Sequence, residues 1–115
     1  MTTLQELKEI IEGLEIPVET AMHSDSLAQK YVVLTPIEAT MIYYDDRPDM
    51  VVHSTTISLF SKENYIKTIN RIISALINAD YTITDSRFVE REKDSGYFHY
   101  SIDVEKTFIY AQEEI

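Results

Sequence analysis

Three histidines are the residues best suited to bind a metal or transfer a proton in this chain. They are His23, in an expected loop, and His53 and His99, in expected strands. Metal sites built from one segment use two histidines four residues apart on a helix, or a short His-x-His pair. Neither spacing occurs in the sequence. We therefore interpret all three as solvated or structural side chains, with His99 on the solvent side of its strand.

Two acidic segments have the carboxylates that a divalent cation or acid–base chemistry would need. Residues 45–49 (DDRPD) lack the glycine and the distal glutamate of an EF-hand calcium loop. Residues 90–94 (EREKD) alternate acidic with basic side chains, which is typical of a charged hairpin. We therefore predict two solvated turns, no metal site and no cofactor.

No residue pattern identifies a reaction. The 2 glycines are too few for a phosphate-binding loop, and no Gly-x-Ser-x-Gly segment presents a serine nucleophile. The absence of cysteine excludes disulfides and thiolate metal ligands. The sequence therefore favours a protein that is not an enzyme.

The balance of charges limits the possible partners. With 20 acidic and 10 basic residues, the net charge is -10, and the basic residues form no cluster. Direct binding of nucleic acid needs a basic surface, so we expect no sequence-specific binding to it. The N-terminal segment MTTLQELKEI is charged, unlike a secretion signal, and no window approaches the roughly 18 apolar residues of a membrane span. We therefore expect no membrane association.

Apolar residues at three- and four-residue spacing predict two amphipathic helices. The first covers about 3–14, with Thr3 and Glu6 as a capping box. The second covers about 61–79, with Ser61 as the N-cap. Its apolar stripe, which we expect to lie in the core, consists of Tyr65, Ile66, Ile69, Ile72, Ile73, Leu76 and Ile77.

Runs of β-branched and aromatic residues predict the strands. These runs lie at 31–35, 37–44, 50–60, 81–91 and 97–110. Pro36 is expected to end the first run, because proline cannot donate a ladder hydrogen bond. In the third run, Ser54, Thr56 and Ser58 share one face, which indicates a sheet covered on one side only.

The two predicted helices and five predicted strands follow the order α-β-β-β-α-β-β. A short extended piece at 16–18 is expected in addition to them. No repeat or internal boundary interrupts them, so we predict a single domain spanning residues 1–115. Its fold class is α+β, with a mainly antiparallel sheet of about four to five strands and two helices packed on one face.

The layout resembles the tail-completion proteins of long-tailed phages, a group that includes the lambda tail terminator and tail-to-head joining proteins. Segment 55–83 (TTISLFSKENYIKTINRIISALINADYTI) has the strand ending in Leu-Phe, the polar cap and the amphipathic helix of that group. Segment 88–110 (FVEREKDSGYFHYSIDVEKTFIY) resembles its late hairpin and aromatic final strand. One departure is Asp46-Arg47, where the group more often has a single aspartate followed by a small polar residue.

The resemblance implies a virion structural protein that is assembled in the host cytoplasm. Its subunits would form a homo-oligomeric ring, commonly six-fold, at the end of the tail tube. That ring ends polymerisation of the tail tube protein, binds the head connector or adaptor, and lets DNA pass through its lumen. We expect the subunit contacts at two turns, formed by Asp45, Asp46, Arg47, Asp49 and Met50, and by Arg91, Glu92, Lys93 and Asp94.

Two other functions remain open at this point. An acidic inhibitor or immunity-type protein would cover a basic partner protein, such as a nuclease, through charge complementarity. Tight one-to-one binding without rings would favour that class. A small ligand-binding or enzyme domain would use the open face of the sheet, and a ligand-dependent rise in melting temperature would favour it.

Overall fold

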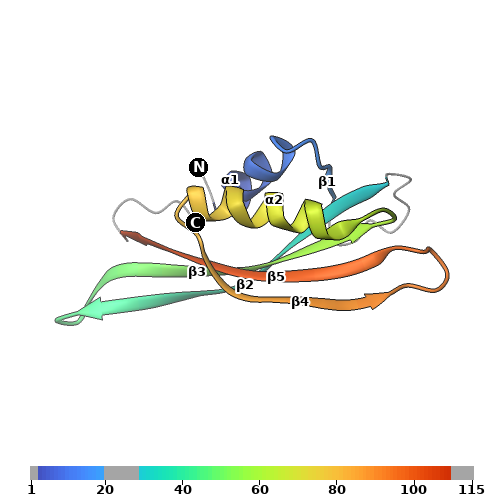
Figure 1. The fold of residues 1–115 in the computed structure, drawn as a ribbon. Helices are drawn as coiled ribbons and strands as arrows, with labels where there is room; N and C mark the ends of the chain where they lie inside the picture. Colours follow the sequence, from blue (N-terminus) through green and yellow to red (C-terminus); the bar gives the residue numbers. More distant parts are fainter. Residues whose placement is uncertain (1–2, 20–28, 110–115) are drawn as a thin grey trace.

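The computed structural model describes residues 3–19 and 29–109. Both helices lie on one face of a five-stranded sheet with the strand order β1-β2-β3-β5-β4 (Figure 1). The elements are α1 (Thr3–Glu12), β1 (Val18–Glu19), β2 (Lys30–Tyr44), β3 (Arg47–Ser61), α2 (Tyr65–Asn78), β4 (Thr82–Arg91) and β5 (Phe98–Ile109). This order confirms the predicted α-β-β-β-α-β-β arrangement. The sheet is mixed, because β1 runs parallel to β2 while the other pairs are antiparallel.

Pro36 does not end a strand, and that prediction is wrong. The two runs predicted at 31–35 and 37–44 form one strand, β2, which pairs with β3 throughout. The ladder shifts register between Pro36 and Glu38 and leaves Ile37 without a partner across from it. Because β1 pairs only with Val32 and Val33, Pro36 lies on an edge of the sheet, where proline and bulges are tolerated.

The connection between β2 and β3 is shorter than the sequence indicates. Residues 45–49 were expected as a turn, but only Asp45 and Asp46 form it, with φ angles of 49° and 66°. Two consecutive positive φ angles are typical of the tight hairpin turns that match the twist of a sheet. Aspartate adopts this conformation more readily than most residues. Arg47 and Asp49 therefore belong to β3.

Both predicted helix caps differ from the structure. Asn64, not Ser61, caps α2, and its Oδ1 accepts a hydrogen bond of 3.1 Å from the N–H of Ile66. Ser61 is the last residue of β3, where it is held by pairing with its neighbours. At the other helix, Thr3 lies within α1, and its hydroxyl is 3.0 Å from Nδ1 of His53.

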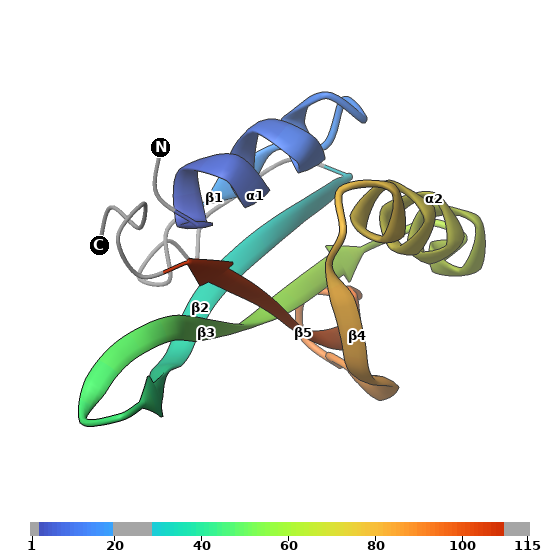
Figure 2. The same cartoon turned by 90° about the vertical axis from the view of Figure 1, so that its left-hand side faces the viewer.

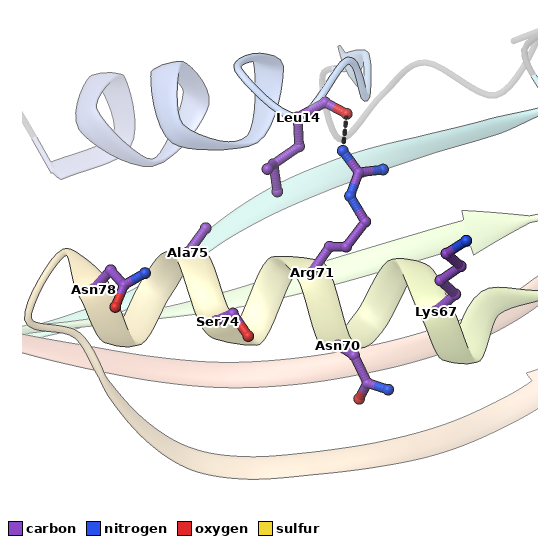
Figure 3. A pocket seen from close by; sticks show the side chains of 7 residues that line it. All are labelled: Leu14, Lys67, Asn70, Arg71, Ser74, Ala75 and Asn78. Atoms are coloured by element: carbon purple, nitrogen blue, oxygen red, sulfur yellow. Dashed lines mark hydrogen bonds between the residues drawn. The ribbon is translucent and has the colours of Figure 1, made fainter.

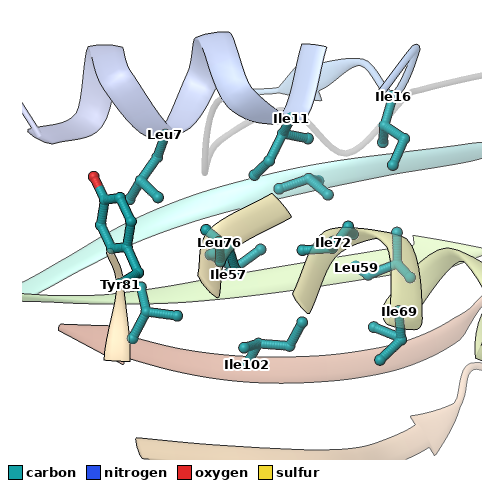
Figure 4. Packing of buried hydrophobic residues seen from close by; sticks show 12 residues of the cluster. Leu7, Ile11, Ile16, Ile57, Leu59, Ile69, Ile72, Leu76, Tyr81 and Ile102 are labelled. Atoms are coloured by element: carbon teal, nitrogen blue, oxygen red, sulfur yellow. The ribbon is translucent and has the colours of Figure 1, made fainter. Parts of the chain in front are cut away.

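The core fills the space between the two helices and the sheet (Figure 4). Leu7 and Ile11 of α1 and Ile72 and Leu76 of α2 are fully buried over the sheet. On the sheet, Ile57 belongs to the same cluster. Ser54, Thr56 and Ser58 of β3 lie on the opposite face, as expected, whereas Thr55 and Ser61 are buried on the core side. Neither helix in the described part of the chain is long and apolar enough to cross a membrane.

The apolar stripe of α2 is wider than the surface beneath it. Ile69, Ile72 and Leu76 are buried, but Ile66 and Ile77 are 59% and 57% exposed. α1 contacts β2, and α2 contacts β4 at the other side of the sheet (Figure 2). β4 is the edge strand of the described sheet. No strand therefore lies beyond it to cover the flank of α2 on that side.

Candidate functional site

The residues predicted to contact other subunits form two groups at opposite ends of the sheet (Figure 1). Met50 pairs with Ile109 at the end of β5, whereas Arg91 pairs with Phe98 at its beginning. β5 has 12 residues, so the two ends are separated by roughly 35 Å at the usual rise of a strand. The longest dimension of the molecule is 52 Å. The two groups therefore do not form one site.

The first group lies at the end of an arm formed by residues 37–50 of the β2–β3 hairpin. Asp45, Asp46, Arg47 and Asp49 are exposed, and Met50 is half-buried. The same arm also exposes large apolar side chains that were not among the predicted contact residues. These are Ile37, Ile42, Tyr43 and Tyr44, with Tyr44 73% exposed.

One sequence signal could have identified those side chains. Ile42, Tyr43 and Tyr44 are consecutive, and successive strand residues point to opposite faces. A sheet with helices on one face only cannot cover all three. An unbroken apolar run in such a strand therefore indicates a surface that needs a partner.

The second group forms a turn that is held by its own hydrogen bonds. The N–H of Glu92 donates to the carbonyl of Tyr97 at 2.8 Å, and the N–H of Gly96 donates to the carbonyl of Glu92 at 2.9 Å. The Glu92 carboxylate accepts a bond of 2.8 Å from Ser95. Gly96 has a φ of 80°, which glycine adopts without strain.

The residues of this second group differ in their contacts and exposure. The guanidinium of Arg91 lies 5.7 Å from the centre of the Phe98 ring, and Glu92 is half-buried. Lys93 and Asp94 are exposed at the tip of the turn. Glu92 thus helps to shape the hairpin, while Arg91, Lys93 and Asp94 are exposed on it.

His53 has a structural role, and His23 lies outside the described residues. The ring of His53 faces the helix side of the sheet. It contacts the hydroxyl of Thr3 in α1 and meets the ring of Phe108 edge-on, with 5.4 Å between ring centres. His53 therefore helps to position α1 on the sheet.

His99 is less exposed than the sequence suggested. It lies on the face away from the helices, but its ring stacks on Phe60 with 4.4 Å between centres. Phe60 stacks in turn on Tyr31, and Tyr31 meets Tyr97 edge-on. Burial lowers the pKa of His99, although Glu92 and Glu90 act in the opposite direction. Tyr31, Phe60, Tyr97 and His99 thus form a cluster of aromatic rings.

A shallow groove of about 450 Å³ lies along α2 on the side of α1 (Figure 3). Arg71 crosses it and donates a hydrogen bond of 3.1 Å to the carbonyl of Leu14. The remaining lining residues supply amides, one hydroxyl, an ammonium and a methyl group: Lys67, Asn70, Ser74, Ala75 and Asn78. No carboxylate or imidazole lines this groove.

The part of the chain that the structure describes contains no group of three or more acidic or histidine side chains able to hold a metal ion. The carboxylates of the arm thus do not converge on a common centre. The arrangement offers exposed ends and apolar surface, which are features of protein–protein contact.

No protein-family model matches the chain, and no curated protein matches it in sequence. Among solved structures, it is similar to a chain of the virion of a native gene transfer agent (GTA) particle. The two chains are 16% identical, and their superposition has a TM-score of 0.50. The match covers 86% of this chain and 81% of the other. The likeness shows that the two chains share a fold over most of their length.

Proposed function

We propose that this protein is a virion structural protein, and more narrowly a tail-completion subunit of a phage-like particle. Its copies form a ring at the end of the tail tube. The ring ends polymerisation of the tube protein and provides the surface to which the head connector or adaptor attaches. Its work is binding, and it is not an enzyme.

The observation that carries this proposal is the position of the two hairpin ends. A ring needs a heterologous interface, in which one surface of a subunit meets a different surface of its neighbour. Asp45 and Asp46 lie at one end of the molecule and Lys93 and Asp94 at the other. Such an arrangement supports head-to-tail contact better than contact about a two-fold axis.

Two further observations support the same function. The fold is shared with a chain of a virion particle, at low sequence identity. The sequence resemblance, which spans about residues 31–110, implies a tail-completion protein. The net charge of -10 suits a ring through which DNA passes, since acidic side chains repel phosphate and prevent DNA from adhering.

The experiment that tests the function is a measurement of the oligomeric state, alone and with tail tubes. Native mass spectrometry would give the number of subunits, and negative-stain imaging would reveal rings or caps at one end of the tubes. We expect rings in solution or caps on tubes. A protein that stays monomeric and leaves tubes uncapped contradicts the proposal. If it also binds a basic nuclease one-to-one, it is an acidic inhibitor.

The contribution of the two ends can be measured with a charge-neutral variant. The combination Asp45→Asn, Asp46→Asn, Lys93→Gln and Asp94→Asn keeps side-chain size, and asparagine tolerates the positive φ of the turn. We expect this variant to fold and to lose ring or cap formation. A matched control, Glu9→Gln with Glu12→Gln, removes charge from exposed positions of α1 and is expected to assemble normally. Unchanged assembly of the tip variant contradicts the assignment of these ends as interfaces.

A further inference from the structure

The groove along α2 carries positive charge in a chain that is strongly acidic as a whole. Lys67 and Arg71 lie one helical turn apart and extend from α2 on the same side (Figure 3). α2 has no acidic residue between Tyr65 and Asn78, and the dipole of the helix adds partial positive charge at its first turn. Because the net charge of the chain is -10, this surface is one that attracts carboxylates.

The charge of the groove is not neutralised by the carboxylates near it. Arg71 donates its hydrogen bond to the backbone carbonyl of Leu14, which holds the guanidinium in place and leaves its charge intact. Lys67 and Arg71 also line a second hollow of about 300 Å³ at the start of α2. The one carboxylate of that hollow belongs to Glu63, and it lies 3.4 Å from the ammonium of Lys30. The two hollows together therefore have an excess of positive charge.

Amide and hydroxyl groups complete the lining of the groove. Asn70, Ser74 and Asn78 are exposed along it. Their N–H and O–H groups can donate to ionised carboxylates, and such hydrogen bonds are roughly twice as strong as those between neutral groups. The groove therefore offers both charge and hydrogen-bond donors to a segment that bears carboxylates.

The tip of the arm, formed by residues 45–49, is an acidic segment that projects from the molecule (Figure 2). Asp45 and Asp46 form its turn, and Asp49 follows in β3. Arg47 is the single cation among these residues, and all four charged side chains are exposed. The tip therefore presents an excess of negative charge on a narrow surface.

Other exposed charged surfaces fit the groove less well. Residues 91–94 (REKD) at the second hairpin end have no net charge. The exposed carboxylates of α1 lie on a helix that packs over the sheet and does not project from it (Figure 1). On the open face of the sheet, Asp85 and Asp103 are paired with Arg87. Charge and shape together therefore favour the tip.

A chain cannot place its own tip in its own groove. The tip lies at the start of β3, whereas α2 begins four residues after β3 ends at Ser61. β3 has 15 residues, so its two ends are roughly 45 Å apart at the usual rise of a strand. The tip can therefore reach this groove only in another copy.

We propose that the tip of one copy docks in the groove along α2 of the next copy, with Asp45 and Asp46 against Lys67 and Arg71. The occupant of the groove is thus a second copy of this chain. The contact joins two different surfaces toward opposite ends of the molecule, so it is head-to-tail and repeats from copy to copy. The inference rests on the proposed function and identifies the surface that receives one of its two contact regions.

Zero-length cross-linking of the natural protein tests the contact directly. A carbodiimide joins a lysine ammonium to a carboxylate only where the two are in contact. Protein labelled with nitrogen-15 is mixed with unlabelled protein before assembly, alone or on tail tubes, so that peptide mass spectrometry distinguishes links between copies. We expect an amide between Lys67 of one copy and the tip of another. Lys8, exposed on α1, is the control and is expected not to link to the tip.

The outcomes separate this inference from the proposed function. Rings or capped tubes without a link between Lys67 and the tip overturn the docking and leave the tail-completion role intact. A link from Lys67 to a carboxylate of α1 or of the tube protein identifies a different occupant and also overturns the docking. The expected link in oligomers that do not cap tubes supports the docking and contradicts the tail role. Absence of any oligomer, alone or on tubes, contradicts both.

A matched pair of variants tests the charge of the groove. Lys67→Glu and Lys8→Glu change the net charge of the chain by the same amount. Both positions are exposed, so thermal melts of the two monomers are expected to coincide. We expect Lys67→Glu to raise the protein concentration needed for assembly by about ten-fold or more, and Lys8→Glu to change it by less than about two-fold. Equal effects of the two substitutions overturn the inference.

A charge exchange tests whether the two surfaces meet. The tip variant Asp45→Asn, Asp46→Asn and Asp49→Lys makes the tip cationic, and asparagine tolerates the positive φ of the turn. We expect this variant to lose assembly, because the groove is cationic too. Addition of Lys67→Glu to the same chain, with or without Arg71→Glu, is expected to recover it. A combined variant that melts like the natural monomer but assembles no better than the tip variant overturns the inference.

Discussion

Lys106 in the last strand donates a hydrogen bond of 2.8 Å to the carboxylate of Glu6 in the first helix. The hydroxyl of Tyr81 donates to the same carboxylate oxygen at 2.9 Å. Lys106 also donates to the carbonyl of Ala79 at 3.0 Å, just after α2, and lies over the Tyr81 ring. This network joins α1, the connection between α2 and β4, and β5, and it connects residues 100 positions apart.

Replacement of Lys106 by methionine is expected to reduce the free energy of unfolding by about 1–3 kcal/mol. The methionine keeps the apolar stem, but the half-buried Glu6 carboxylate loses one donor and the carbonyl of Ala79 loses another. Urea unfolding at neutral pH measures the change. Lys8→Met, on the exposed side of α1, is the control and is expected to change stability by less than about 0.5 kcal/mol. Equal stabilities of the two variants contradict a stabilising role for the network.

The same network predicts a specific acid sensitivity. Burial alone raises the pKa of Glu6, but the bonds from Lys106 and Tyr81 outweigh it, so the pKa lies below its ordinary value. The stabilisation is therefore complete above the ordinary value of about 4.3 and is lost as the pH falls through the lowered pKa. Glu6→Gln removes this pH-dependent stabilisation. The difference in urea midpoint between the natural protein and Glu6→Gln should shrink from pH 7 toward strong acid, and a constant difference contradicts it.

His99 predicts a second dependence on pH, closer to neutrality. Because burial lowers the pKa of His99, the unfolded chain binds this proton more readily than the folded one. Stability is thus complete above the ordinary value of about 6.5 and decreases as the pH falls below it. His99→Phe retains an aromatic ring for stacking on Phe60. The variant should lose less stability than the natural protein between about pH 7.5 and 5.5, measured by thermal melts. Parallel curves for the two proteins contradict the assignment.

Periodicity predicted the elements well where local spacing alone decides the structure. The alternation of Phe98, Tyr100 and Ile102 identifies the helix-facing side of β5, because successive strand residues point to opposite faces. The predicted N-cap of α2 was wrong because of pairing between residues that are far apart in the sequence. Ser61 and Asn64 are both suitable caps by type, but Ser61 pairs with Lys30 and Phe98 in the sheet. That pairing delays the helix by one turn and cannot be read from the segment itself.

The exposure of the two hairpin ends was predicted from the sequence, whereas the exposed apolar side chains were not. Asp45, Asp46, Lys93 and Asp94 are at exposed ends, as turn chemistry indicated, because such residues favour tight connections. The apolar surfaces were missed, since a helical stripe shows which residues are apolar but not how wide the surface beneath them is. Ile66 and Ile77 remain exposed although α2 packs on the sheet, and their exposure depends on how the helices and strands are arranged, which the helical segment alone does not give.

Two isoleucines of α2 are expected to contribute very differently to stability. Ile72 is fully buried, so Ile72→Ala leaves a cavity in the core and is expected to cost about 2–5 kcal/mol of unfolding free energy. Ile66 is 59% exposed, and Ile66→Ala is expected to cost less than about 1 kcal/mol in the monomer. Calorimetry or urea unfolding of the monomers measures both values. Equal losses of stability in the two variants contradict the assignment of Ile72 to the core and of Ile66 to the surface.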